Sequence, residues 1–405
     1  MKVLLLSGGS GKRLWPLSNN QRSKQFIKIL RHEDNLESMV QRVWRQLGTL
    51  GLQEDAYIAT GEGQRSILKH QLGIDDSKII TEPTRRDTFP AIALASTYMH
   101  TMVGADLDET IAVLPVDPYV DLSFFKKVLE LENLLDEEKA SLGLIGIQPS
   151  LPSEKYGYIV PESASSRKVK RFQEKPNRQY AKELIDEGAV WNAGVFGFKL
   201  STMLDLLKEM NITTDFNKLQ QNYDLLPKDS FDYEFSEKQD NIAFLRYDGF
   251  WKDLGTWNTL TEEMDTRAVG YTTQMIDTEN THVINETRLP IAAIGVKDLV
   301  IAAGPEGIFV STKEESPRVK EISEELFESV RYVEENWGVR NTLYESKTAL
   351  TRLYQILDGK EIFLDLTQNQ KLIKLSGKGT IAQTDHAYSV TGIKDFSFVV
   401  VTEKI

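Results

Sequence analysis

A short apolar run that leads directly into a glycine-rich turn constrains this chain more than any other feature. Residues 3–6 are all apolar and predict a buried β-strand at the N-terminus. Three glycines follow it, namely Gly8, Gly9 and Gly11. Glycine permits backbone conformations in which successive N–H groups point at one anion, so a phosphate can approach closely. Because Arg13 and Lys24 add two cations to the same segment, the pattern predicts a polyphosphate site.

Two better-known glycine loops do not match this segment. A P-loop would place Ser or Thr after Gly11 and Lys12, but Arg13 stands there and the magnesium-binding hydroxyl is missing. A dinucleotide fingerprint would need a third glycine at the position of Leu14. The remaining structural alternative is a tight turn that carries cations by chance.

Length and composition exclude several classes of protein. A chain of 405 residues is expected to form two or three domains, and its formal charge of −12 argues against a nucleic-acid partner. The absence of cysteine excludes disulfides, a thiol nucleophile and a zinc–thiolate site. No apolar stretch approaches the roughly 18 residues of a membrane span, and the first apolar run is too short for a signal peptide. We therefore expect a cytoplasmic protein without a membrane partner.

The first 150 residues alternate between two hydrophobic patterns. Strand-like runs occur at 3–6, 56–60, 79–80, 111–114 and 142–147, and helical spacing occurs at 36–47, 64–72, 89–102 and 123–135. Such alternation predicts an α/β fold with a parallel sheet and helices on both faces. Ligands of such sheets bind beyond the carboxyl ends of the strands, where the glycine turn and Asp117 both fall. A mixed region follows up to about residue 265, with a hairpin near 156–161 and strands at 195–198 and 242–247.

Several motifs along the chain resemble those of one enzyme family. Leu14-Trp15-Pro16-Leu17-Ser18 and Lys24-Gln25-Phe26 resemble the signature of sugar-nucleotide pyrophosphorylases, and most closely that of mannose-1-phosphate guanylyltransferases. Further matches follow in order at Glu82-Pro83, Arg86-Asp87-Thr88, Leu114-Pro115-Val116-Asp117, Tyr156-Gly157-Tyr158-Ile159, Glu174-Lys175-Pro176, Trp191-Asn192-Ala193-Gly194 and Trp251-Lys252-Asp253-Leu254-Gly255. The resemblance covers roughly the first 320 residues and implies a Rossmann-like, mixed-sheet nucleotidyltransferase domain followed by small β-rich C-terminal modules.

The domain organisation follows from this resemblance and from a change of pattern after about residue 270. We expect a catalytic domain over 1–268, a short β-coil module like a left-handed β-helix over 269–322, and a small β module over 323–405. The last segment weakly resembles a degenerate cupin. It has no histidine between 350 and 375, where the metal ligands of such cupins would fall. We therefore reject an isomerase activity and expect a structural or oligomerising role, with a homodimer as the assembly.

The resemblance also implies the reaction, in which GTP and mannose 1-phosphate give GDP-mannose and pyrophosphate. A phosphate monoester loses its second proton near pH ~6, so the attacking oxygen is already anionic and needs no general base. The enzyme has to hold two polyanions in line and neutralise their charge, with Mg²⁺ as cofactor.

The site residues that match the family fall into four groups. Arg13 and Lys24 are the expected catalytic cations for the β- and γ-phosphates, with Arg22 as an alternative second cation. The expected nucleotide-binding residues are Leu6, Gly8, Gly9, Gly11, Glu82, Arg86 and Asp117. Asp117 and Asp253 match the metal-binding aspartates. The expected sugar phosphate ligands are Gly157, Glu174, Lys175 and Asn192.

Four positions depart from the family pattern and leave alternatives open. Asp87 stands for the usual Asn, Phe89 for Ala, Ser23 for Pro and Pro118 for His. These changes could signal another base, or another sugar 1-phosphate such as a heptose or glucose derivative. A further alternative is a regulatory subunit that binds a nucleotide sugar without turnover.

Overall fold

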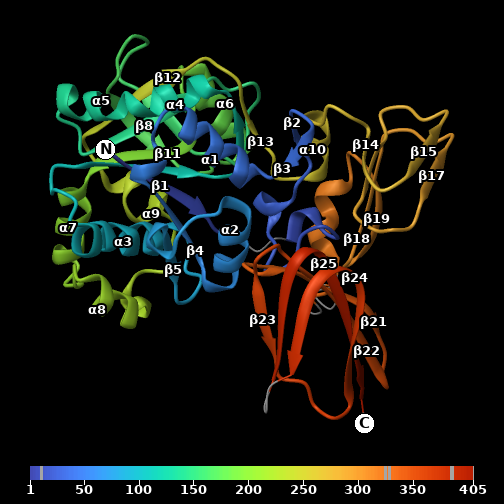
Figure 1. Ribbon diagram of the computed structural model, residues 1–405. Helices are drawn as coiled ribbons and strands as arrows, with labels where there is room; N and C mark the ends of the chain where they lie inside the picture. Colours follow the sequence, from blue (N-terminus) through green and yellow to red (C-terminus); the bar gives the residue numbers. More distant parts are fainter. Residues whose placement is uncertain (10–11, 323–325, 327–329, 384–386, 405) are drawn as a thin grey trace. The chain divides into compact units, whose positions relative to one another are not determined.

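The chain folds into two compact units that are interleaved in sequence. The computed structural model describes residues 1–9, 12–322, 326, 330–383 and 387–404 (Figure 1). The first unit comprises Met1–Gly8, Arg42–Glu62 and Asp75–Asp253, and the second comprises Gly9–Gln41, Gly63–Ile74 and Leu254–Ile405. The segment that follows the glycine turn therefore belongs with the C-terminal part of the chain. The expected linear boundaries after 268 and 322 remain predictions.

A nine-stranded mixed sheet forms the centre of the first unit. Its strands are β1 (Lys2–Ser7), β4 (Ala56–Gly61), β5 (Ile79–Glu82), β6 (Thr110–Pro115), β8 (Leu142–Ile147), β9 (Tyr158–Pro161), β10 (Val169–Gln173), β11 (Val190–Lys199) and β12 (Ile242–Tyr247). The order β5-β4-β1-β6 is parallel, as the alternation predicted, whereas β11 runs antiparallel to β6 and to β8. The mixed α/β class expected from the sequence is confirmed.

Helices cover both faces of this sheet (Figure 1). They are α1 (Met39–Thr49), α3 (Thr88–Tyr98), α4 (Leu122–Leu129), α5 (Leu131–Glu138), α6 (Arg178–Asp186), α7 (Leu200–Glu209), α8 (Phe216–Gln221) and α9 (Phe231–Glu234). In α3 every residue from Phe89 to Thr97 is buried, because other elements pack around it on all sides. The helix expected over 123–135 is two helices, since the amide of Glu130 bonds the carbonyl of Lys127 and ends α4. No helix in the described part of the chain combines the length and apolar character that crossing a bilayer requires.

Short parallel strands build the middle of the second unit. Its elements before residue 316 are β2 (Leu30–His32), β3 (Asn35–Glu37), α2 (Arg65–Leu72), α10 (Trp257–Glu262), β14 (Ala268–Gly270), β15 (Thr273–Ile276), β16 (His282–Asn285), β17 (Ile291–Ile294), β18 (Leu299–Gly304) and β19 (Gly307–Thr312). Strands β14, β16 and β18 pair in parallel, as do β15 and β17. Successive parallel rungs of this kind agree with the β-coil expected after residue 270.

A six-stranded antiparallel sheet ends the chain. Its strands are β20 (Tyr332–Glu335), β21 (Gly338–Glu345), β22 (Ala349–Ile356), β23 (Glu361–Leu364), β24 (Gln370–Gln383) and β25 (Tyr388–Glu403). Aromatic side chains fill its core: the rings of Tyr354 and Phe398 stack 5.0 Å apart at 3°, and Trp337 also stacks on Tyr354. The charged residues 317–335 include most of a 3₁₀ segment, Ser316–Glu321, and the first strand of this sheet, β20.

Two glycines of the β-coil pack closely against the segment that follows the glycine turn. A Cβ atom on Gly304 would lie 2.7 Å from the Leu17 side chain and 2.9 Å from the carbonyl oxygen of Pro16. A Cβ on Gly307 would lie 2.7 Å from the ring of Trp15, whose carbonyl accepts a hydrogen bond from the Trp257 indole at 3.1 Å. This close packing against glycine holds residues 15–17 in place.

Replacing Gly304 by Ala should destabilise the second unit by about 1–3 kcal/mol, because the backbone carbonyl of Pro16 opposes the new methyl group in addition to the Leu17 side chain. Guanidinium unfolding followed by tryptophan fluorescence would measure this, since Trp15 and Trp257 are buried there. Gly63→Ala is the matched control, because a Cβ at that position meets no described atom within 4 Å. Equal midpoints for both variants would contradict the packing argument.

Candidate active site

One pocket of the first unit gathers the predicted metal and sugar phosphate ligands. It has a volume of about 220 Å³. Its lining comprises Pro115, Asp117, Pro118, Lys155, Tyr156, Gly157, Glu174, Lys175, Asn192, Ala193, Gly194, Asp232, Trp251 and Asp253. Six of these had been predicted from the sequence, although they lie up to 136 positions apart between Asp117 and Asp253. The structure therefore brings these two groups together.

A small two-stranded sheet carries Asp253, and Asp117 directly precedes its other strand. Strand β7 (Pro118–Val120) pairs antiparallel with β13 (Trp251–Asp253), so that Asp253 stands opposite Pro118, the neighbour of Asp117. Burial and the negative charges of Asp253 and Asp117 raise the pKa of Tyr156 to about 12. Among the described residues, no group of three or more His, Cys, Asp or Glu side chains is placed to hold a metal. Two carboxylates fit a cation that completes its shell with water and phosphate oxygens.

Glu174 and Lys175 form a close ion pair in the lining of the pocket. The Lys175 Nζ lies 2.6 Å from Glu174 Oε1, and the Glu174 side chain is only 5% exposed whereas that of Lys175 is 51% exposed. Burial raises the pKa of Glu174, and the lysine partly opposes that shift. Lys175 has a φ of 38°, a left-handed conformation that is uncommon for lysine. Such strain is typical of functional positions.

Gly157 has a steric reason to be glycine. A Cβ atom there would lie 2.5 Å from Glu174 Oε2 and 2.8 Å from the Phe172 ring. The sequence predicted that this glycine admits the sugar phosphate, and the structure shows that it admits the carboxylate of Glu174. Its carbonyl accepts a 2.8 Å hydrogen bond from the Asn192 backbone amide, which ties the two motifs together.

An irregularity in β11 aims Asn192 into the pocket. The register of β11 against β8 shifts between Asn192 and Phe196, and Gly194 in that stretch has a φ of 72°. The Gly194 amide donates to Asn192 Oδ1 at 3.1 Å. Bulges of this kind re-aim single side chains, and here the Asn192 side-chain amide donates to Asp232 Oδ1 at 3.1 Å.

Asp232 is a site residue that the sequence analysis missed. It lies on the short helix α9 and lines the pocket beside Glu174 and Lys175. Burial, followed by the negative charge of Glu174, raises the pKa of Asp232 to about 7, while Lys175 and Asn192 act in the opposite direction. The available signal was an acidic residue inside an aromatic run, Phe231-Asp232-Tyr233. That pattern alone does not indicate a particular chemical role for Asp232.

The nucleotide-binding candidates of the first unit follow the carboxyl ends of parallel strands. Leu6 lies on β1, and its carbonyl accepts from the amide of Val116, the residue before Asp117, at 3.3 Å. Gly8 follows the same strand. Glu82 ends β5 and is buried; its Oε2 accepts from the Tyr223 hydroxyl at 2.7 Å, and burial raises its pKa.

Arg86 makes contacts that stabilise a loop of the same unit. Its guanidinium donates to Asp224 Oδ1 at 2.9 Å and to the carbonyl of Leu226 at 3.0 Å. The neighbouring departures from the family pattern are explained by packing. Asp87 has a φ of 76° and a ψ of −171°, a strained conformation, and caps α3 by accepting a hydrogen bond from the Thr88 amide, while Phe89 is fully buried in the core. Pro118 is the departure that lines the pocket.

The remaining predicted residues belong to the second unit. Gly9 has a φ of 129°, and Arg13 is exposed. Lys24 opens a 3₁₀ turn (Lys24–Phe26) and is half-buried. Arg22, the alternative second cation, is buried and bonded to Glu286, so it serves a structural contact instead. Gly11 lies outside the described residues.

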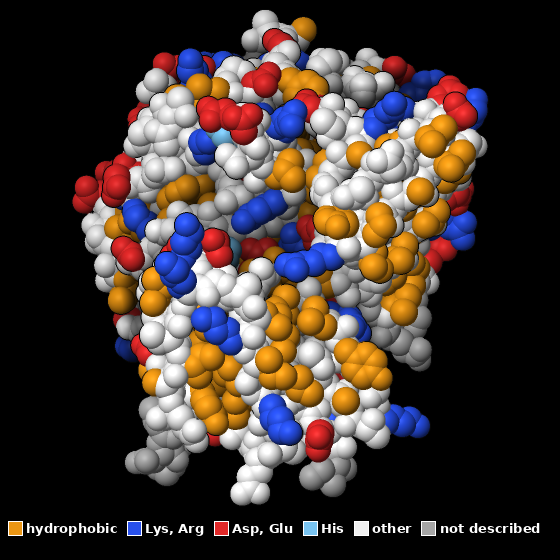
Figure 2. Space-filling view, turned by 45° about the vertical axis from the view of Figure 1, so that its right-hand side comes forward, with side chains coloured by type: hydrophobic (Ala, Val, Ile, Leu, Met, Phe, Trp, Pro, Cys, Tyr) orange, Lys and Arg blue, Asp and Glu red, His pale blue; other side chains and the backbone are white. Residues whose placement is uncertain are grey.

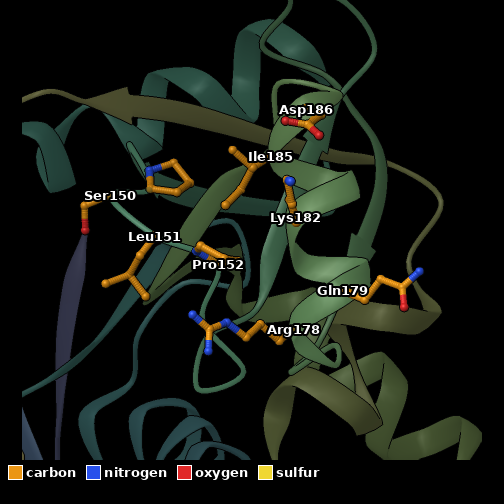
Figure 3. A pocket seen from close by; sticks show the side chains of 9 residues that line it. Ser150, Leu151, Pro152, Arg178, Gln179, Lys182, Ile185 and Asp186 are labelled. Carbon is orange, nitrogen blue, oxygen red and sulfur yellow. The ribbon is translucent and has the colours of Figure 1, made fainter.

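A second and larger groove contains none of the predicted residues. It has a volume of about 760 Å³ and lies between α6 and the loop after β8. Figure 3 shows apolar Leu151, Pro152 and Ile185 beside the cations Arg178 and Lys182. Among the described residues that line this groove there is no carboxylate pair comparable to Asp117 and Asp253, so we keep the smaller pocket as the candidate active site.

Comparison with known proteins agrees with this assignment. The model of the nucleotidyl transferase family matches residues 2–268, and a MannoseP isomerase/GMP-like β-helix domain matches residues 274–326. A mannose-1-phosphate guanylyltransferase of Escherichia coli is 30% identical over 359 residues, covering 80% of this chain and 75% of the relative. The mannose-1-phosphate guanylyltransferase RfbM of Salmonella typhimurium is 27% identical over 426 residues, covering 96% and 87%.

A solved structure is similar as well. The crystal structure of a mannose-1-phosphate geranyltransferase from Thermus thermophilus superimposes with a TM-score of 0.66 at 27% identity, covering 80% of this chain and 98% of that one. Nucleotidyl transferases generally use a divalent metal, which the aspartate pair fits. The chain therefore belongs to the nucleotidyl transferase family, as a sugar-1-phosphate nucleotidyltransferase of the mannose-1-phosphate guanylyltransferase type.

Proposed function

We propose that this protein transfers GMP from GTP to mannose 1-phosphate, forming GDP-mannose and releasing pyrophosphate. The observation that carries the proposal is the pocket that places Lys175 and Asn192 together with Asp117 and Asp253. Lys175 and Asn192 would offer a cation and hydrogen-bonding groups to a sugar phosphate. Asp117 and Asp253 would offer two carboxylates to a metal. The names of the relatives support mannose and guanine as the sugar and the base.

The nucleophile of this reaction is an oxygen of the sugar phosphate, which carries its negative charge at neutral pH. Lys175 would hold that phosphate by charge, and its own pKa is raised in part by Glu174, so it stays protonated. No side chain has to remove a proton from the nucleophile. The contribution of the protein is therefore orientation and charge neutralisation.

Asp117 and Asp253 would hold Mg²⁺, which when bound neutralises phosphate charge between the two substrates. The proximity of their backbones through the β7–β13 pair supports this assignment. Hard carboxylate oxygens suit magnesium better than softer metals. Tyr156, whose hydroxyl stays protonated near both aspartates, can donate a hydrogen bond within this pocket.

We assign the triphosphate to the glycine turn and to the cations of the segment that follows it. Gly8 and Gly9 would present backbone N–H groups to phosphate oxygens. Arg13 and Lys24 would bind the β- and γ-phosphates and the departing pyrophosphate, Arg13 through paired N–H groups and Lys24 as a point charge. The exposure of Arg13 supports this role, because a solvated cation is available to a ligand.

Base and sugar are assigned to two different carboxylates. Glu82 would accept hydrogen bonds from N1–H and the exocyclic amine of guanine, and its contact with Tyr223 would fix the carboxylate. Glu174, Asp232 and Asn192 would bind sugar hydroxyls, since they converge in the pocket next to Lys175. Because Asp87 and Phe89 serve capping and packing, they give no support to another substrate.

We further propose a homodimer in the cytoplasm, the compartment in which GTP and sugar phosphates are available. Apolar side chains stand exposed on the outer side of the β-coil: Ile276 52%, Leu289 70%, Ile294 64%, Ile308 66% and Val310 60%. Figure 2 shows hydrophobic side chains gathered over this part of the second unit. Ile276 and Ile294 are paired in register on β15 and β17, so these two apolar side chains are neighbours.

The first test is pyrophosphate release with Mg²⁺, in which GTP, ATP, CTP and UTP are crossed against mannose, glucose and heptose 1-phosphates. We expect turnover with GTP and mannose 1-phosphate, and a loss of at least about 100-fold in Asp117→Asn and Asp253→Asn. Asp248→Asn, an exposed aspartate near β13, should stay at the wild-type rate. Binding of GDP-mannose without turnover of any pair would favour a regulatory subunit instead.

Asp232→Asn should stabilise the protein at high pH and not at low pH. A carboxyl whose pKa is raised from 3.8 to about 7 prefers its neutral form in the folded state, so its ionisation destabilises the fold as pH rises through this window. The expected gain at pH 8 is about 1–2 kcal/mol, or about 2–6 °C in thermal midpoint, and it should vanish near pH 4. The exposed Asp240→Asn is the control, and a pH-independent gain would refute the assignment.

Ile294→Asp and Ile308→Asp should weaken the dimer by at least about tenfold in dissociation constant, because each buries a charge in an apolar contact. Light scattering after size exclusion over a concentration series would show a shift to monomer. Leu225→Asp, equally exposed on the first unit, should leave the mass unchanged. A wild-type monomer at all concentrations would exclude the proposed assembly.

A further inference from the structure

A buried arginine connects the segment that follows the glycine turn to distant parts of the second unit. Arg22 is 4% exposed, and its two terminal nitrogens donate to the carboxylate of Glu286 at 2.7 and 2.9 Å. Its guanidinium lies 4.7 Å from the ring centre of Tyr332, and its Nε lies 3.5 Å from Glu334. These partners raise the pKa of Arg22 despite its burial, so the group stays charged. Paired burial of this kind fixes one geometry, because a displaced guanidinium would lose its partners.

Glu334 also connects to Phe26, which lies on the other side of Lys24 in the sequence. This carboxylate is 6% exposed and lies on β20, the first strand of the C-terminal sheet. It accepts a hydrogen bond from Gln71 Nε2 at 3.1 Å, and the same amide donates to the carbonyl of Phe26 at 2.9 Å. Lys24 thus stands between two residues, Arg22 and Phe26, that are both connected to Glu334.

A third connection joins β20 to Asn19, which precedes Arg22 in the segment that follows the glycine turn. Asn19 Nδ2 donates to Glu306 Oε1 and to the carbonyl of Tyr332, both at 2.9 Å. The Asn19 side-chain oxygen accepts from the backbone amide of Arg22 at 2.7 Å. The Tyr332 amide also donates to Glu306 Oε1, at 3.0 Å. Residues 19–22 are therefore closed into a turn by the hydrogen bond between Asn19 and Arg22, and they are linked to β20 through Tyr332.

We propose, resting on the nucleotide role assigned to Lys24 above, that Glu334 is a positioning residue that acts on Lys24 through Arg22 and Gln71. The C-terminal sheet, which the sequence assigned to structure or oligomerisation, then forms part of the nucleotide-binding machinery. The reason is geometric. A lysine on a 3₁₀ turn provides a point charge, and its contribution to phosphate binding depends on the position in which the turn is held. Here the turn is held on both sides by one carboxylate from more than 300 positions along the chain.

Glu334→Gln tests this with little change in volume. We expect the KM for GTP to rise by about tenfold while the KM for mannose 1-phosphate changes less than about twofold. A merely structural residue would lower the active fraction and thus kcat, and would leave both KM values alone. Glu345→Gln is the matched control, because it removes another carboxylate of the same sheet, one that pairs with Lys404. An unchanged KM for GTP in a folded Glu334→Gln protein would overturn the proposal.

Gln71→Met provides a second variant in case Glu334→Gln fails to fold. It keeps the length of the side chain and breaks the connection between Phe26 and Glu334. The expected rise in the KM for GTP is smaller, about threefold. In a Lys24→Ala background either substitution should add little, because residues that act through one group are not additive. Full additivity would show that Glu334 does not act through Lys24.

Hydrogen exchange supplies a readout that does not depend on turnover. The amides of Leu17, Asn19, Phe26 and Ile27 are all hydrogen-bonded within the segment. In Glu334→Gln their exchange should accelerate by about tenfold, whereas Glu345→Gln should match the wild type. Unchanged exchange would overturn the positioning role even if GTP proved not to be the substrate. Accelerated exchange in a protein inactive with GTP would instead locate the failure in the proposed function.

Discussion

The constraint on which this structure depends is that charged side chains must be held in place by partners where water is partly excluded. Three buried ionisable groups of the described chain have such partners. Glu174 is paired with Lys175, Glu82 with the Tyr223 hydroxyl, and Arg22 with Glu286. An unpaired charge in such places would destabilise the fold by several kcal/mol or change its protonation. Pairing therefore serves stability and orientation together.

Backbone irregularities supply the second requirement, which is close approach. The bulge around Gly194 turns Asn192 into the pocket, and Gly157 leaves room for Glu174. Lys175, which follows Glu174 in the sequence, adopts a left-handed backbone conformation. Regular strands would point these side chains to alternate faces of the sheet, so a pocket with convergent groups needs such departures.

Much of the fold and part of the site could be predicted from the sequence. The strands at 142–147 and 242–247 agree with β8 and β12, because a buried strand is a local apolar run. Asp117 and Asp253 could be selected because each lies in a recognisable motif, and the structure places both in one pocket, while their binding of a metal stays a prediction. Asp232 could not, since its importance arises from burial beside Glu174, which α9 creates in three dimensions. The departure at Phe89 left another substrate open, and only its burial in the core explains it.

The sequence by itself determined the class of fold, the family, and the motif residues to which we assign the chemistry. Each of these depends on local patterns or on short motifs. Only the tertiary structure decided how those residues are supported. It showed that the segment after the glycine turn packs with the C-terminal part of the chain, and that Arg22 binds Glu286 rather than standing free. The physical reason is that partners separated by 264 positions, such as these two, are chosen by packing and charge in the folded chain, which no local pattern records.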